Sequence, residues 1–218
     1  SAASSITGII SDGDSAAILT KAGSAKLILS GNNTYTGAVT VNAGRLHITH
    51  ANGLGATDGA TTVADGARLN INGGLTIAEA ITINGTGDSS KGALHFNGGN
   101  NTVSGNITLG ADAKIHSNTG TQTISGTING AHALTITGTD NFTISGIVGG
   151  SAAPDSVAAT ITNSGTFTVG ANITTSGNQT YTAAGGIVTS GARTFTSNSG
   201  TVNFVSALSG DNNVTVTG

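Results

Sequence analysis

Three groups of residues in this chain have types and spacings that could support chemistry. Asp12 and Asp14, within SDGDS, could place two carboxylates around a calcium ion in a short turn. His47 and His50 could ligate a metal from one stretch of strand. The cluster Gly31–Gly37, with Asn and Thr between two glycines, could cradle a phosphate with its backbone N–H groups.

The sequence around the acids and the histidines favours structural roles. Calcium-binding β-roll repeats need GGxGxD in tandem, which is absent, so we expect Asp12 and Asp14 to lie in a solvated turn. A metal site at His47 and His50 would need further ligands, and none is evident. Alternation along this strand points Leu46 inward and His47 outward, so we expect surface histidines.

The glycine cluster lacks the partners of a nucleotide site. A P-loop needs Gly-Lys-Ser/Thr after its spacer, and a dinucleotide fold needs GxGxxG after a strand, but Gly31–Gly37 has neither. The segment Gly53–Gly59 comes near, with the wrong last spacing and no helix to follow. We therefore predict that Gly31, Gly37 and Gly44 form bends between strands, because glycine tolerates left-handed backbone conformations.

The pattern contains no catalytic constellation. Glycan-active enzymes built on β-helices use clusters of Asp, Arg and Lys on one face. Here the ten acids are spread along the chain, and Asp65 and Glu79 are isolated. The abundant serines have no His and acid placed by motif. The sequence therefore predicts a protein that is not an enzyme, with no catalytic residue, no cofactor and no metal site.

Two polar patterns recur irregularly. Thr-x-Thr pairs can form the flat face of an ice-binding solenoid, but their spacings are irregular and those between Thr166, Thr180 and Thr194 are shorter than a coil, so we expect the pairs on different faces. Asn-x-Thr triplets, such as those at Asn106 and Asn172, are expected by chance in so Asn- and Thr-rich a chain. The Thr-x-Thr pairs are Thr34/Thr36, Thr166/Thr168, Thr180/Thr182, Thr194/Thr196 and Thr215/Thr217.

Composition narrows the class of protein. Only 8% of the 218 residues are charged, yet the chain is full of Val, Ile and Thr, which favours strands over disorder. The formal net charge of −3 leaves no basic footprint, which argues against nucleic acid as a partner. No stretch approaches the roughly 20 apolar residues of a membrane helix, so we predict no membrane insertion of this segment. With no Met and no visible signal peptide, we expect a piece of a larger precursor or a processed piece. The absence of Cys excludes disulfides and thiolate metal sites.

The elements that must position these residues are short strands, separated by Gly, Asn or Asp at intervals of about six to eight residues. Thr123–Gly126 recurs as Thr143–Gly146, twenty residues on, and Val103–Gly105 precedes the first copy by twenty-one. Three strands of about seven residues give a coil of about 21 residues, and hence roughly ten coils. The predicted strands include Lys26–Leu29, Ala38–Val41, Arg45–Ile48, Arg68–Ile71, Ala80–Ile83 and Ala133–Ile136.

These features predict one all-β domain over residues 1–218, a right-handed parallel β-helix in the form of a three-sided β-solenoid. Gly149–Asp155 is a candidate for a projecting loop. An antiparallel β-sandwich or barrel is the alternative, and the tight turn spacing and lack of Asn-Gly hairpins count against it. Inward side chains would fill a narrow core, and the expected inward pairs are Ile124/Ile144, Phe167/Ile173 and Tyr181/Ile187.

One stretch carries a family-specific motif. Thr20-Lys21-Ala22-Gly23 is followed by LILSGNNTYTG and then by TVNAGRL. The whole, at about residues 18–49, resembles the passenger-associated transport repeat of bacterial autotransporters, with one departure at Ala38, where a second Gly is common. The residues that match the motif are Gly31, Asn33, Thr34, Tyr35, Thr36, Gly37, Val41, Asn42, Gly44 and Leu46.

The resemblance implies a secreted β-helical passenger that is exported through an outer-membrane barrel to the bacterial cell surface. The repeat would assist export and folding and would carry no activity of its own. We therefore expect a structural or adhesive segment that mediates adhesion to host-cell or bacterial surface components, or self-association. The alternatives are an architectural stalk with no binding of its own and a secreted glycan-active β-helix enzyme. Because a solenoid exposes the edges of its end coils, we expect this piece to lie in a longer array or to stack end to end.

Overall fold

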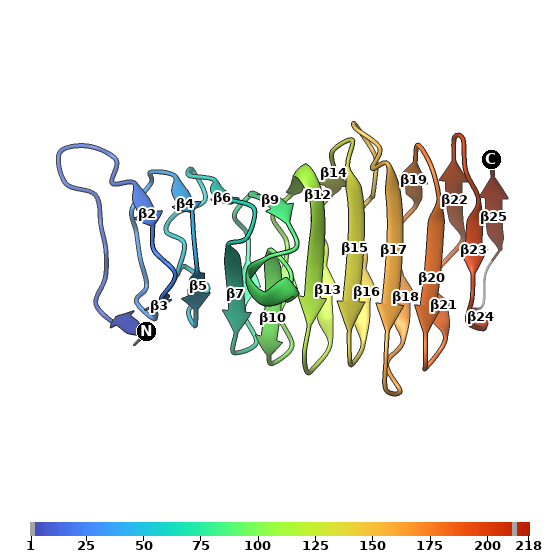
Figure 1. The fold of residues 1–218 in the computed structure, drawn as a ribbon, viewed down its shortest axis with the longest axis horizontal. Helices are drawn as coiled ribbons and strands as arrows, with labels where there is room; N and C mark the ends of the chain where they lie inside the picture. The colour runs from blue at the N-terminus through green and yellow to red at the C-terminus, as the bar shows by residue number, and fades with distance from the viewer. Residues whose placement is uncertain (1–2, 211–212) are drawn as a thin grey trace.

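The computed structural model describes residues 3–210 and 213–218, which form short strands wound into successive coils (Figure 1). Strands of successive coils pair in parallel, and ten of them follow one another along a single face. The one helical element among these residues is the 3-10 turn η1 (Asp88–Ser90). The predicted parallel β-solenoid of about ten coils is confirmed, and the antiparallel alternative is wrong.

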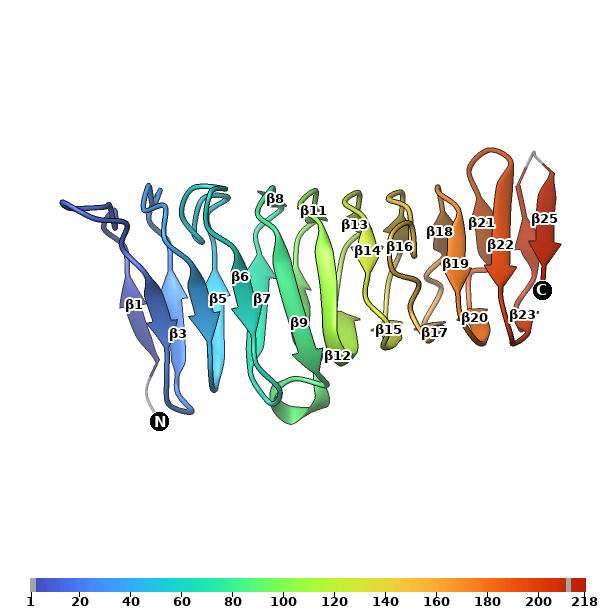
Figure 2. The same cartoon turned by 90° about the horizontal axis from the view of Figure 1, so that it is seen from above.

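Each coil contributes strands to as many as three faces, which we name A, B and C (Figure 2). Face A contains β1 (Ser4–Ile6), β3 (Lys26–Leu29), β5 (Arg45–Ile48), β7 (Arg68–Asn72), β10 (Leu94–Gly98), the second half of β12 (Ile107–Ser117), β15 (Ala133–Gly138), β17 (Ser156–Ile161), β20 (Gln179–Ala183) and β23 (Val202–Phe204). Face B contains β8 (Thr76–Ile77), β11 (Thr102–Val103), β13 (Gln122–Ile124), β16 (Phe142–Ile144), β18 (Phe167–Val169), β21 (Ile187–Thr189) and β24 (Leu208–Ser209). Face C contains β2 (Leu19–Lys21), β4 (Val39–Val41), β6 (Thr61–Val63), β9 (Ile81–Gly85), the first half of β12, β14 (Ile128–Asn129), β19 (Ile173–Thr175), β22 (Arg193–Ser197) and β25 (Val214–Thr217).

The predicted sequence repeats meet in register. Ile124 pairs with Ile144 on one side and with Val103 on the other, as the repeat spacing requires. Coil lengths nevertheless vary, because a short coil joins Leu27 to its partner Leu46, whereas the longer coil that contains η1 joins Leu69 to Leu94. The extra residues are accommodated in turns, because the paired strands must keep their inward and outward alternation.

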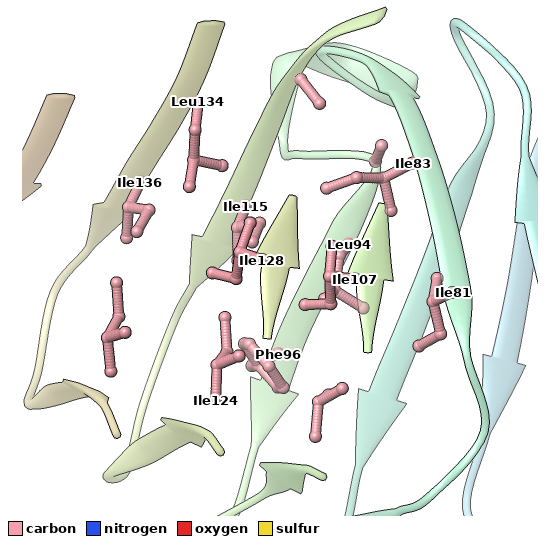
Figure 3. Close-up of a cluster of buried hydrophobic side chains, with 14 of the residues drawn as sticks. Ile81, Ile83, Leu94, Phe96, Ile107, Ile115, Ile124, Ile128, Leu134 and Ile136 are labelled. Carbon is pink, nitrogen blue, oxygen red and sulfur yellow. The ribbon is translucent and has the colours of Figure 1, made fainter. Parts of the chain in front are cut away.

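Inward side chains stack along the solenoid axis. On face A, Leu46, Leu69, Leu94 and Ile115 follow one another in register, and each is fully buried. Figure 3 shows this stacking for the central coils, with side chains from different faces pointing into one core. Each coil therefore covers the apolar surface of the coil before it, as in other repeat proteins.

Aromatic rings continue the core in the C-terminal half. The rings of Phe142 and Phe167 lie 6.3 Å apart, and those of Phe167 and Tyr181 lie 5.6 Å apart. All the expected inward residues are buried, but two of the expected pairs are wrong. Phe167 on face B pairs with Phe142, while Ile173 is on face C, and Tyr181 is on face A while Ile187 is on face B. The residues share the core from different faces because a coil is longer than the spacing between them.

Exposed asparagines in the central and C-terminal coils tie several coils to the next. The Oδ1 atom of Asn106 accepts hydrogen bonds from the backbone N–H of Thr127 at 3.1 Å and from its hydroxyl at 2.9 Å. Asn141 makes the same pair of contacts with the Thr one coil later, and Asn172 accepts from the N–H of Thr194 at 3.0 Å. Asn106 and Asn172 thus both bond across coils, to threonines that lie outside their own Asn-x-Thr triplets.

The segment Gly149–Asp155 follows the strand bridge at Val148 and precedes β17. The N–H of Ser151 donates to Oδ1 of Asn129 at 3.0 Å, and the N–H of Asp155 donates to the carbonyl of His132 at 3.1 Å. These contacts hold both ends of the segment against the preceding coil.

Large apolar side chains are exposed in the end coils. Ile9 and Ile18 in the first coil are 66% and 75% exposed, and Val216 in the last is 52% exposed. Each lies where no further coil of the described chain stacks on it. Within the described residues, no helix has the length and apolar character needed to cross a bilayer.

Candidate functional site

The buried amide of Asn33 joins three coils. Its Oδ1 atom accepts the N–H of Ile10 at 2.9 Å, and its Nδ2 atom donates to the carbonyl of Gly53 at 2.9 Å. Ile10 belongs to the preceding coil and Gly53 to the following one, so a single side chain satisfies backbone groups in both. The neighbouring Asn32 is exposed and accepts one hydrogen bond, from Nδ2 of Asn52 at 2.8 Å.

The three residues after Asn33 also pack between coils. Thr34 is exposed, but its backbone N–H donates to the preceding coil. Tyr35 is 1% exposed, and a Cβ at Gly55 would lie 2.7 Å from Cε2 of its ring. Thr36 donates its hydroxyl to Oδ2 of Asp12 at 2.7 Å and its N–H to the same carboxylate at 3.1 Å. The motif thus aims its side chains at neighbouring coils.

The motif glycines allow close approach of backbones. A Cβ at Gly31 would overlap the carbonyl oxygen of Gly8, and a Cβ at Gly37 would overlap that of Ala17. Neither has a positive φ, whereas Gly44 does, at 65°. The expectation of bends that need left-handed backbone therefore holds for Gly44 alone. At Gly31 and Gly37 the cause is close contact with the backbone of the preceding coil.

A buried lysine closes the turns at the start and end of the motif. Lys21 is 5% exposed, and its Nζ donates to the carbonyls of Ala22 at 2.8 Å, Gly23 at 2.7 Å and Ala43 at 3.0 Å. Burial lowers the pKa of this ammonium. All three of its protons have acceptors, which is how a buried charge is tolerated.

The last part of the motif continues faces C and A. Val41 and Leu46 are fully buried and pair in register with Val63 and Leu69. The Asn42 side chain is exposed, and its backbone N–H donates to the preceding coil. Val41, Leu46 and the backbone of Asn42 thus stack the repeat on its neighbours.

Asp12 is held by the motif, so the expected solvated turn is wrong for this residue. Its Oδ1 atom accepts the N–H of Ala17 at 2.7 Å, and the carboxylate also accepts both donors of Thr36. The Ala17 and Thr36 hydrogen bonds hold its pKa below the usual range. Asp14 is exposed, as expected. Within the described residues, no group of three His or acidic side chains could hold a metal ion.

His47 is more buried than the sequence suggests. It lies in the outward row of face A, between Ile28 and Asn70, and is only 9% exposed. Burial, and then the charge of Lys26, lower its pKa. The expectation of a surface histidine is therefore wrong for His47. His50 is half-buried, and its Nδ1 accepts a backbone N–H two residues on at 3.1 Å.

Asp65 and Glu79 have different surroundings and do not form a carboxylate pair. Asp65 is exposed and contacts Gly85. Glu79 is 3% exposed, its Oε1 accepts the hydroxyl of Thr61 at 2.6 Å, and its Oε2 has no hydrogen-bond partner among the described residues. Burial raises the pKa of Glu79 to about 7, against the opposing effect of the Thr61 hydrogen bond. Burial, and then the Glu79 charge, raise the pKa of Tyr35.

The expectation that the Thr-x-Thr pairs fall on different faces is partly wrong. Thr194 pairs with Thr215 and Thr196 with Thr217, so these two pairs stack on face C. The spacing between these two pairs is therefore one coil. Thr180/Thr182 lies on face A, as expected for an irregular set.

Comparison with known proteins identifies the same stretch of the chain as a known sequence repeat. Residues 19–48 match the family model described as Passenger-associated-transport-repeat. The chain carries a passenger-associated transport repeat. A stretch of 100 residues is also 36% identical to the "Adhesin BmaC autotransporter" of Brucella suis biovar 1 (strain 1330), a match that covers 44% of this chain and 3% of that protein. No solved structure matches the chain.

In the transport repeat, the side chains of Lys21, Asn33, Tyr35 and Thr36 are committed to packing or hydrogen bonds within the solenoid. They leave no free donor set for a ligand. The surface left for recognition is the outer side of the three faces, which the sequence motifs do not mark.

Replacing Asn33 should destabilise the solenoid far more than replacing its neighbour. Asn33→Ala leaves the Ile10 N–H and the Gly53 carbonyl without partners, so we expect a loss of about 2–3 kcal/mol in the free energy of unfolding. Asn32→Ala, the matched control, should change it by less than about 0.5 kcal/mol. Denaturant titration followed by circular dichroism measures both. Equal losses would contradict the coil-joining role of Asn33.

Glu79 should make the solenoid less stable at alkaline pH. Its pKa of about 7 in the folded chain lies above the ordinary value of 4.5. The contribution of the protonated Glu79 carboxyl to the free energy of unfolding is therefore complete below pH 4.5 and is lost as the pH rises through 7. Between pH 5 and pH 8.5 the free energy of unfolding should fall by about 2–3 kcal/mol more in the unaltered protein than in Glu79→Gln. Parallel pH profiles for the two proteins would refute this.

Proposed function

We propose that this segment is an adhesive part of a secreted, surface-displayed autotransporter passenger, and that it makes contact through uncharged threonine faces. The observation that carries the proposal is a row of outward threonines on successive coils. On face C, β2, β4, β6, β9 and β12 each place one threonine in register with the next. These residues are Thr20, Thr40, Thr62, Thr82 and Thr108.

Face B carries a second row of the same kind. Its outward residues, again paired in register, are Thr76, Thr102, Thr123, Thr143 and Thr168. All ten threonines are exposed or half-buried. The parts of faces C and B that carry these two rows therefore present uncharged threonines to the outside, and Arg193 lies further along face C, on β22.

These rows suit broad, weak contact. Paired strands lie about 4.8 Å apart, so hydroxyl and methyl groups repeat regularly along the axis. A hydroxyl donates and accepts, and desolvating it costs much less than desolvating a charge. Many such contacts across a large area favour adhesion to a surface component or packing against a second solenoid.

The relative named an adhesin supports adhesion over a purely architectural stalk, and the transport repeat supports display at the cell surface. A secreted glycan-active enzyme, the remaining alternative, would need acids gathered on one face. Asp65 is exposed while Glu79 is buried in the core, which counts against that class.

Charging the face C row should weaken adhesion. In the displayed passenger, Thr62→Lys with Thr108→Lys places two ammonium groups on exposed positions of this row. We expect cell adhesion or self-aggregation to fall about tenfold, equivalent to about 1.4 kcal/mol. The matched control is Ser125→Lys with Ala131→Lys, which adds the same charge at exposed turn positions. Full adhesion by both variants would leave the stalk as the function of this segment.

A further inference from the structure

The chain concentrates its cations on one part of face A despite its net charge of −3. Of its seven Lys and Arg residues, five lie on or beside β3, β5, β7, β10 and β12. Of these five, Arg68 is buried and the other four are half-buried or exposed. We call them the basic row: Lys26, Arg45, Arg68, Lys91 and Lys114.

The basic row is nearly straight. Lys26 pairs in register with Arg45, and Arg45 with Arg68. The next position in the row is Ala93, whose N–H donates to the carbonyl of Lys114 at 2.8 Å. With strands about 4.8 Å apart, the distance from the first to the last strand of the row is about 19 Å along the solenoid axis.

The loop around η1 adds Lys91 to the row and supplies its one paired acid. Asp88 Oδ2 lies 2.7 Å from Nε of Arg45 and 3.5 Å from Nη2 of Arg68. Lys114 Nζ donates to the carbonyl of Ser90 at 3.0 Å, which fixes the loop over the face. Within the described residues, Asp88 is thus the single acid that pairs with any of the five cations of the basic row.

Two further acids lie near the basic row: Asp65 in the turn before β7, and Asp112 in the middle of β12. Asp65 contacts Gly85, and Asp112 faces His132, with 4.0 Å between Oδ1 and Nδ1. Neither forms an ion pair with a cation of the basic row within the described residues.

Two buried groups under the loop retain unused hydrogen-bonding capacity. Arg68 is 5% exposed and His95 is 4% exposed, and neither Nε of the arginine nor Nε2 of the histidine has a hydrogen-bond partner among the described residues. Burial, and then Arg68, lower the pKa of His95 to about 4. Burial, and then Lys91 and Lys114, lower the pKa of His116. Arg68, Lys91 and Lys114 therefore lie close enough to these two histidines to lower their pKa values.

We propose that the basic row binds a linear sulfated polysaccharide laid along the solenoid axis. This inference deepens the adhesive function proposed above and rests on it. Lys26, Lys91 and Lys114 would pair with sulfate groups at the surface. Arg45 can present a planar guanidinium, which suits oxyanions in fork geometry. Asp88 competes with the ligand for the two arginines.

The surroundings favour a glycan over nucleic acid. Binding of single-stranded nucleic acid relies on exposed aromatic rings that stack on bases. Of the seven Tyr and Phe residues, six are fully buried and Phe204 is half-buried in the core. One straight row of cations matches a single extended polyanion, whereas duplex DNA would present two phosphate strands to a wider surface.

Binding of the purified segment to immobilised heparin tests the proposal. The variant Lys26→Gln/Lys91→Gln/Lys114→Gln should weaken binding at least about tenfold near 0.1 M salt and reduce the salt dependence. Arg193→Gln, which removes a cation on face C, is the matched control and should bind like the unaltered segment. Asp88→Asn should bind more tightly, because it frees Arg45 and Arg68. Circular dichroism verifies that each variant is folded.

Three results would overturn the basic row as a glycan site. The first is that the unaltered segment does not bind heparin. The second is that the triple variant and Arg193→Gln lose the same heparin affinity. The third is that the segment binds duplex DNA as tightly as heparin and loses that binding to the same extent in the triple variant. Adhesion to cells stripped of sulfated polysaccharide separates this inference from the adhesive function itself. If the segment binds no heparin but adhesion still depends on Thr62 and Thr108, only the basic row proposal fails. If heparin binding depends on the row while the threonine variant adheres fully, the threonine contact fails instead.

Discussion

The close stacking of one coil's backbone on the next is the constraint on which the rest of this structure depends. At the corner between faces B and C, a Cβ at Gly126 would overlap the carbonyl oxygen of Gly105, and a Cβ at Gly146 would overlap that of Gly126. Glycine is needed at these two positions because a Cβ there would meet the backbone of the preceding coil and force the two coils apart. Glu79 occupies the same corner one coil before Gly105 and turns its carboxylate into the core, where its partner is Thr61. A residue other than glycine is therefore accommodated at this corner when its side chain points into the core, as that of Glu79 does.

The same closeness explains why polar residues in this chain serve structure before chemistry. A side chain at a turn lies within reach of unpaired N–H and C=O groups of the adjacent coil, and leaving those groups unpaired is costly. Asn33, Asn106 and Asn141 each pair with backbone groups of a neighbouring coil. Lys21 does so with a full ammonium charge. Asn33 and Lys21 both lie within residues 19–48, the stretch that matches the transport repeat, so part of what is specific in that sequence joins one coil to the next.

The outer surface is released from these demands and changes along the axis. On face A the outward residues are Lys114 and His116 on β12, and their partners on β15 are Thr135 and Thr137. The face thus passes from basic to uncharged between two adjacent strands. A long passenger built this way can carry different contact surfaces on one continuous core, because outward positions do not affect the stacking beneath them.

The sequence by itself determined the strands, the repeat, the parallel solenoid and the inward residues, since alternation and coil-length periodicity are local properties of the chain. It also located the motif at residues 18–49, although not the function of each residue in it. Only the tertiary structure decided which residues meet across coils, because coil length varies along the chain and the register cannot be counted from spacing alone. The spacing also misled the pairing of Phe167 with Ile173, which are six residues apart and so lie on different faces of one coil, and it gave no sign of the contact between Asp12 and Thr36. The cations of the basic row are likewise about one coil apart in a chain whose net charge is negative, and they form a single surface only because folding brings their strands side by side.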